Sequence, residues 1–153
     1  MAEKKLKNIF LQGAVSASFI AESIQRHSSE TGIGAHSIFL GQVRSDALNN
    51  KKVAAIEYTA YEAMALEKMN GIREAIFEKY DLTCMHVHHS LGRVAAGEIS
   101  LFVFTSSKHR RAAMEACNEA VERIKAELPV WGKELFSTGF GEAGETYKWK
   151  ENT

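Results

Sequence analysis

Two long stretches with helical periodicity flank two stretches with strand periodicity, and this order limits the folds open to the chain. Residues 62–80 and 108–128 each place apolar side chains at spacings of three and four. Between them, the side chains of residues 83–91 alternate between a largely apolar set and a more polar set. Residues 99–105 are rich in β-formers, and a glycine-containing turn separates the two stretches. Because hairpin-like and helical connections are mixed, the order predicts an α+β protein with a mixed or largely antiparallel sheet.

The rest of the chain predicts more strands and one short helix. A helix is expected from Ser18, as its N-cap, to about His27. Residues 45–52 form a polar segment that we expect to be a mobile loop, and Pro129 ends the second long helix. The further strands are expected at 6–12, 35–43 and 53–61.

Length and charge narrow the class of protein. The 153 residues suit a single domain, 1–153, with a flexible C-terminal tail from about 138 to 153. Lysine plus arginine and aspartate plus glutamate both number 19, which argues against a nucleic-acid partner. No run of about 18 apolar residues predicts a membrane span. The two cysteines fit no metal spacing and the N-terminus lacks a signal-peptide core, so we expect a cytoplasmic protein.

Three adjacent basic side chains stand where the helix 108–128 should begin. Cations are unfavourable at the positive end of a helix dipole, so His109 and Arg110 suggest an anion-binding site for a phosphate or carboxylate. The alternative is a surface cluster paired with acids one turn on. Glu115 lies four residues from Arg111 and can satisfy it, which leaves the other two without a helix partner. Arg44, after a strand and before the polar segment, is a further candidate to face a substrate.

Two lysines near the end of the same helix are candidates for chemistry. Lys125 is adjacent to the apolar position Ile124, and Lys133 follows beyond Pro129 and Trp131. If the chain folds back there, the two ammonium groups would lower each other's pKa, and a lysine of lowered pKa can serve as a base. The alternative for Lys125 is a solvated lysine at a helix edge.

Histidines cluster at residues 86–89, where a metal site is conceivable. His86 and His88 share one face of the expected strand, and Cys84 is the one nearby ligand of another type. Alternation explains the pattern as a sheet surface, so we expect no metal.

Five segments together resemble one family, the large catalytic subunit of molybdopterin synthase. The segments run in family order and cover roughly residues 35 to 150. They are FLGQVRSD, IEYTAYEAM, HSLGRVAAGE, SSKHR and ERIKAELPVWGKE.

The resemblance implies an α/β-hammerhead fold and a homodimer of large subunits within a heterotetramer. The implied partner is a small ubiquitin-like sulfur carrier whose C-terminal Gly-Gly thiocarboxylate enters the active site. The implied substrate is cyclic pyranopterin monophosphate, which two sulfur insertions convert to the dithiolene of molybdopterin for the molybdenum cofactor. Sulfur comes from the carrier, so no metal or organic cofactor is expected.

The resemblance also assigns roles to residues. Arg44, His109 and Arg110 would hold the substrate phosphate. Lys125 matches the essential helix lysine, which would transfer a proton or stabilise the acyl-transfer intermediate.

The segment after the helix departs from the family pattern. The family commonly has two adjacent basic residues after tryptophan, whereas this chain has Trp131-Gly132-Lys133-Glu134. We therefore expect Lys133 to act as a second catalytic and substrate-binding lysine, with Glu134 beside it, or else that role is absent. The missing side chain keeps open an alternative function, a non-catalytic module that only binds the carrier. An RNA-binding module is disfavoured by the zero net charge.

Overall fold

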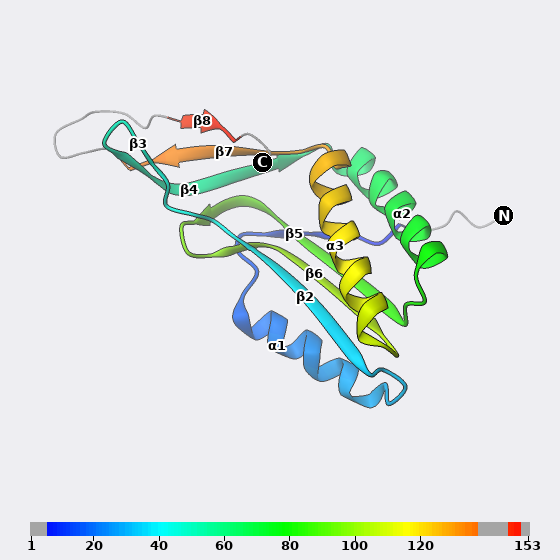
Figure 1. Cartoon of the computed structure of the whole chain (residues 1–153). Helices are drawn as coiled ribbons and strands as arrows, with labels where there is room; N and C mark the ends of the chain where they lie inside the picture. Colours follow the sequence, from blue (N-terminus) through cyan, green and yellow to red (C-terminus); the bar gives the residue numbers. More distant parts are fainter. Residues whose placement is uncertain (1–5, 138–146, 151–153) are drawn as a thin grey trace.

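A mixed sheet of eight strands forms the centre of the computed structural model, which describes residues 6–137 and 147–150 (Figure 1). The strands are β1 (Phe10–Gln12), β2 (Ala35–Gln42), β3 (Ala47–Leu48), β4 (Lys51–Ala60), β5 (Cys84–Ala95), β6 (Ile99–Ser107), β7 (Val130–Phe136) and β8 (Tyr147–Trp149). The helices are α1 (Ala17–Arg26), α2 (Glu62–Lys79) and α3 (Arg110–Glu127), with a 3-10 turn, η1 (His27–Ser29).

The strand order is β2-β6-β5-β4-β7-β8, with β3 beside β4 and β1 beside β5. The β1–β5 pair is parallel and the other pairs are antiparallel. The predicted α+β class with a mixed sheet is therefore confirmed, as are the apolar faces expected for the two long helices. The buried residues on those faces are Ala65, Met69, Ile72, Ile76, Ala113, Cys117, Ala120, Ile124 and Leu128.

Helices α2 and α3 cover one face of the β2-β6-β5 part of the sheet, and α1 covers the other face. Met85 and Val87 on β5 belong to the main core with α2 and α3, which lie side by side in Figure 1. The alternate residues of the strand point the other way, where His88 contacts Phe19 of α1 with ring centroids 4.7 Å apart. The predicted alternation along this strand is confirmed, but its polar face is covered by α1 instead of being open sheet surface.

One long strand joins the two parts of the sheet. The first half of β5 pairs with β6, and the second half pairs with β4. Between them, Gly92 has a φ of +80°, a backbone conformation that glycine adopts without strain. This continuous strand brings β4 and β7 next to the C-terminal end of α3 (Figure 1).

The largest correction to the sequence prediction is β7. We expected a turn at Trp131-Gly132-Lys133-Glu134, whereas these residues lie inside β7, opposite Thr59 to Ile56 of β4. Pro129 ends α3 as predicted, and Val130 starts the strand at once. The apolar and polar residues of this segment do not alternate clearly, so strand periodicity was absent from the sequence.

Two smaller boundaries also differ. The N-cap of α1 is Ser16, whose hydroxyl accepts a hydrogen bond from the Phe19 amide, and not Ser18. The expected loop at 45–52 instead forms a hairpin of β3 and the start of β4. Asn49 and Asn50 form its turn, both with positive φ, which asparagine tolerates better than most residues.

The expected flexible tail, about 138–153, falls mostly outside the described residues. Of that range the structure describes residues 147–150, and Tyr147–Trp149 form β8 against β7. No helix among the described residues has the length and apolar character needed to cross a membrane.

Candidate functional site

A cavity of about 220 Å³ opens where the C-terminal end of α3 meets β4, β5 and β7. Its walls include Lys125 of α3, Tyr58 of β4, His89 of β5 and Trp131 of β7. The sequence creates this corner because Pro129 stops the helix and the chain enters β7 immediately. The end of α3 and residues of five strands, β2, β4, β5, β6 and β7, therefore line the same small space.

Lys125 is the cation at the centre of this site. It follows Ile124, which is buried in the main core, so its side chain leaves the helix at the edge of the packed face. The residue keeps substantial solvent exposure, yet burial around its ammonium group lowers its pKa, and the nearby charge of Lys150 lowers it further. Glu122 acts in the opposite direction and raises it. A larger fraction of Lys125 is thus neutral at physiological pH than for a fully solvated lysine.

Lys150 is the second lysine that lines this cavity, and no pattern in the sequence predicted it. The residue directly follows β8, and its amide donates a 2.8 Å hydrogen bond to the Gly132 carbonyl. This backbone bond holds the end of β8 against β7, which places Lys150 at the cavity wall. Its position depends on the pairing of β7 with β8, a long-range contact that spacing along the chain does not predict.

The absence of a side chain at Gly132 has a packing reason. A Cβ added there would lie 2.9 Å from Cγ2 of Ile56 and 3.3 Å from Cε1 of Tyr58. Both side chains are on β4, the neighbouring strand. A lysine at this position would require these two neighbours to move, so Gly132 fits the packing of Tyr58 against the cavity.

The opposite wall consists of a hydrogen-bonded tyrosine and a neutral histidine. The Tyr58 hydroxyl donates to Oγ of Ser100 at 3.1 Å, and burial raises the pKa of Tyr58 despite that bond. The His89 ring packs edge-on against Tyr58, with centroids 5.1 Å apart. Burial lowers the pKa of His89 to about 4. Its Nδ1 lies 2.8 Å from the Ser90 carbonyl oxygen and donates to it, so Nε2 is the unprotonated nitrogen.

Lys133 and Glu134 are close in sequence to the cavity but are not among its lining residues. The ammonium of Lys133 lies over two aromatic rings near β8, 4.6 Å from the Tyr147 centroid and 5.7 Å from that of Trp149. The structure therefore brings Lys150, and not Lys133, beside Lys125. Glu134 lies near enough to Tyr58 for its charge to raise that pKa.

The cationic residues at the start of α3 lie at the other end of the helix. Arg110 and Lys125 are fifteen positions apart, or about 22 Å along a helix. His109 and Arg110 are exposed beside a separate shallow pocket that also involves Met114. Arg111 pairs with Glu115 at 3.4 Å, as the spacing predicted. Within 6–137 and 147–150, no carboxylate pairs with His109 or Arg110.

Arg44 is not among the residues that line the cavity. Gln42, two residues before it, is part of the lining, whereas Arg44 is exposed and pairs with Asp46 at 3.2 Å. An exposed pair of this kind is weak and screened by salt, so the guanidinium remains available to an anionic ligand.

The arrangement combines a lysine of lowered pKa, a second ammonium group, a half-buried tyrosine hydroxyl and a neutral imidazole around one small space. These groups are suited to proton transfer and to stabilising negative charge as it develops on a bound ligand. The fold and this site together define a small α+β protein with a polar pocket that contains two lysines.

The comparisons with known proteins identify the family. The family described as MoaE protein matches residues 14–127, which is most of the chain, so the chain belongs to the MoaE family.

Curated relatives carry one shared name, molybdopterin synthase catalytic subunit. The protein from Culex quinquefasciatus is 42% identical over 120 residues, which are 78% of this chain and 73% of the relative. That from Drosophila willistoni is 40% identical over 124 residues, 80% of this chain. The match covers 32% of the Drosophila protein, so the chain spans about a third of that relative's length.

Solved structures show the same architecture. Molybdopterin synthase from Staphylococcus aureus superposes with a TM-score of 0.78 at 28% identity, covering 96% of this chain and 99% of that one. A complex of subunits 1 and 2 of molybdopterin-converting factor from Helicobacter pylori gives a TM-score of 0.70 at 23% identity, covering 82% of each chain. The second likeness concerns the fold alone.

Proposed function

We propose that this chain is the catalytic subunit of a molybdopterin synthase and acts as a sulfurtransferase. In this proposal it moves sulfur from the thiocarboxylate of a small ubiquitin-like carrier to cyclic pyranopterin monophosphate and forms the dithiolene of molybdopterin. The observation that carries the proposal is the cavity at the end of α3, where Lys125 and Lys150 converge in a chain of the MoaE family. The cytoplasm, where carrier thiocarboxylates and free cysteines persist, is the proposed location.

The chemistry assigned to the cavity follows from its charges. Lys125 transfers a proton, because its lowered pKa makes the neutral amine more accessible than in a solvated lysine. The neutral amine accepts a proton, and the ammonium group that results can donate it again. Lys150 supplies a second positive charge for the carboxylate that each sulfur transfer leaves on the carrier. In this account Lys150 takes the place that the sequence assigned to Lys133.

The carrier is proposed to reach the cavity with its C-terminal glycines. Glycine has no side chain, so two of them suit a small cavity whose lining includes Gly41, Gly132 and Trp131. Trp131 is 46% exposed and packs edge-on against Tyr61, with centroids 5.9 Å apart. This exposed aromatic pair forms a rim on which a partner can dock.

A homodimer is proposed to supply the phosphate-binding cations. His109 and Arg110 are too far from Lys125 in one chain to hold the same small substrate, at about 22 Å along α3. In a twofold dimer, the start of α3 in one copy can approach the end of α3 in the other. Each site would then combine Lys125 and Lys150 of one chain with His109 and Arg110 of its partner, and a heterotetramer with two carriers follows.

The test is single-turnover conversion of cyclic pyranopterin monophosphate by the purified full chain with thiocarboxylated carrier. Carrier ending in an ordinary carboxylate is the matched control. Dithiolene formation with the first carrier alone supports the proposal. Binding of the thiocarboxylated carrier without conversion would instead identify a non-catalytic carrier-binding module.

A further inference from the structure

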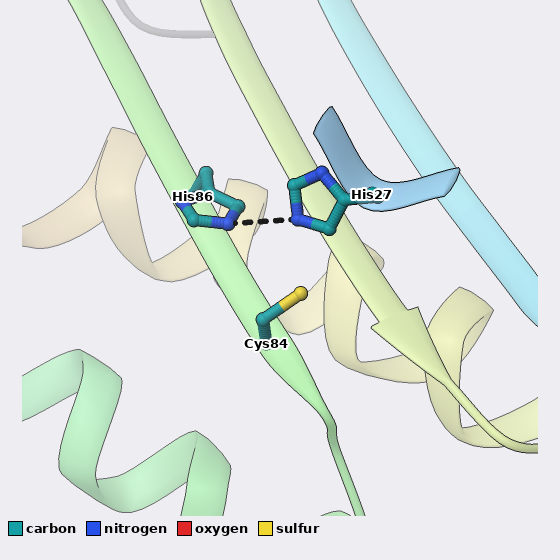
Figure 2. A group of neighbouring side chains, drawn as sticks. All are labelled: His27, Cys84 and His86. Atoms are coloured by element: carbon teal, nitrogen blue, oxygen red, sulfur yellow. Dashed lines mark hydrogen bonds between the residues drawn. The ribbon is translucent and has the colours of Figure 1, made fainter. Parts of the chain in front are cut away.

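Three side chains with metal-binding atoms meet on the face of the sheet opposite α3. His27 is the first residue of η1, and Cys84 and His86 lie at the start of β5. One ligand atom from each residue lies within 4.8 Å of the others. Figure 2 shows a nitrogen at the edge of each imidazole ring directed at the other ring, with the Cys84 sulfur pointing toward the pair. His27 is 57 positions before Cys84 and 59 before His86, so the fold and not local spacing brings it to the other two residues.

We propose that His27, Cys84 and His86 form a Zn²⁺ site that fastens the end of α1 to the first residues of β5. Two imidazoles and one thiolate are ligands that Zn²⁺ prefers, and a water molecule completes a tetrahedral set. Within the part of the chain that the structure describes, the protein supplies three ligands to this site, one from each of these side chains. The inference concerns a different face of the sheet from the lysine cavity and does not depend on the proposed enzyme activity.

The distance between the two rings fits a shared metal ion. Nε2 of His27 and Nε2 of His86 are 3.0 Å apart. In a tetrahedral zinc site with Zn–N near 2.0–2.1 Å and Zn–S near 2.3 Å, ligand atoms lie roughly 3.3–3.6 Å from one another. The rings therefore need to separate by only a few tenths of an ångström. The Cys84 sulfur, within 4.8 Å of both nitrogens, needs to approach them by about 1 Å at most.

The ring of His27 is already oriented for ligation. Its Nδ1 lies 2.6 Å from the Ser23 carbonyl and donates to it, which leaves the Nε2 lone pair directed at His86. A histidine that ligates zinc through one nitrogen usually donates from the other in this way, which fixes the ring and its tautomer. Phe104 packs against the same ring, with centroids 4.7 Å apart, and provides an apolar wall.

The surroundings of His86 favour its neutral form. Burial lowers the pKa of His86 to about 4, and the neighbouring charges of His27, Lys7, His88 and Arg73 lower it further. His86 is therefore unprotonated at neutral pH and available as a ligand. The charges of Lys7 and Arg73 oppose a divalent ion. Zn²⁺ binds cysteine as the thiolate, whose negative charge would offset them, so binding at Cys84 would release the thiol proton.

The helix that this site would fasten is otherwise weakly anchored. Of the ten residues of α1, all of which the structure describes, Ser23 alone is buried. Phe19, near the start of the helix, contacts His88 and Phe102. A zinc ion at His27 would add an attachment at the opposite end of α1, so its expected effect is on stability.

The test uses the full chain freed of metal with a chelator and then titrated with Co²⁺ as a spectroscopic probe. We expect one Co²⁺ per chain, a thiolate-to-cobalt charge-transfer band, tetrahedral d–d bands and displacement by Zn²⁺. Cys84→Ser and His86→Gln should each weaken binding by about 100-fold or more. Two matched controls, Cys117→Ala at the other cysteine and His88→Gln on the same strand face, should leave the band unchanged.

Thermal unfolding provides a second readout. Zn²⁺ at about 100 times its Kd should raise the Tm of the wild type by roughly 5 °C or more, and should not raise that of Cys84→Ser. No charge-transfer band in the wild type, or a full band in Cys84→Ser, would overturn the proposal. The compared quantity is the rise in Tm that Zn²⁺ causes in each protein, so a variant with a lower Tm without metal can still be tested. An equal rise in the wild type and in Cys84→Ser would overturn the proposal as well.

Discussion

The two ends of α3 carry positive charge in opposite environments. At the first turn, His109 and Arg110 are exposed, and at the last turn Lys125 stands in a cavity that lowers its pKa. A guanidinium stays charged at every physiological pH and suits binding of an anion. A lysine of lowered pKa can gain and lose a proton. In the proposed function, α3 thus has a binding end at His109 and Arg110 and a reacting end at Lys125. The two ends are about 22 Å apart along the helix, too far for one small substrate to contact both in a single chain.

Removing the reacting end should have the largest effect. Lys125→Ala should reduce the single-turnover rate of dithiolene formation by about 100-fold or more, because the proton-transfer group is lost. Carrier binding and the Tm should stay near wild type. The matched control is Lys68→Ala, an exposed lysine on α2. If Lys125→Ala loses folding or carrier binding instead, Lys125 is structural and the contrast between the two helix ends fails.

Removing the charge beside Lys125 should change the pH dependence. The charge of Lys150 lowers the pKa of Lys125, so Lys150→Ala should raise that pKa. The rate that depends on neutral Lys125 should then rise at a higher pH than in the wild type, with about a tenfold loss near pH 7. Rate–pH profiles of the two proteins measure this shift. Lys148→Ala on β8 is the control, and a profile of Lys150→Ala that matches wild type would remove Lys150 from the site.

A change at the binding end should affect substrate affinity without shifting that profile. Arg110→Ala should raise the KM for the phosphate-bearing substrate by about tenfold, because a charge-assisted hydrogen bond is lost. The rate–pH profile should keep its wild-type midpoint, since Arg110 is about 22 Å from Lys125 along the helix. Arg111→Ala is the matched control because Arg111 is already paired with Glu115. A KM equal to wild type would show that this end does not bind substrate.

The smallest effect is expected at Lys133. Its ammonium lies over the rings of Tyr147 and Trp149 and not in the cavity lining. Lys133→Ala should therefore change the conversion rate less than about twofold and lower the free energy of unfolding by about 0.5–1 kcal/mol. Urea denaturation and single-turnover kinetics measure the two effects. Collapse of conversion in this variant would restore Lys133 as the second catalytic lysine.

The parts that the sequence predicted well are those with local periodicity. The burial of Met69 and Ile76 on α2, and of Cys117 and Ile124 on α3, followed from spacings of three and four. The alternation of β5 was equally clear. The pairing of Arg111 with Glu115 was predicted for the same reason, because both residues lie on one helix.

The parts that the sequence missed depend on contacts between distant segments. Trp131 and Gly132 were assigned to a turn because a short strand with glycine and mixed polarity has no clear period. Lys150 reaches the cavity through the β7–β8 pairing, and His27 meets Cys84 across the α1–β5 contact. Each of these positions is set by tertiary packing, which a single sequence does not report.

The most direct test of a site shared between two copies is complementation between two impaired variants. Chains with Lys125→Ala and chains with Arg110→Ala are refolded together in equal amounts, so that about half of the dimers contain one of each. If the binding end of one copy serves the reacting end of the other, one site in each mixed dimer is intact. Dithiolene formation should then recover to about a quarter of the wild-type rate at low substrate concentration. Activity that stays at the mean of the two separate variants would contradict the account, because the two ends of α3 would not share a site.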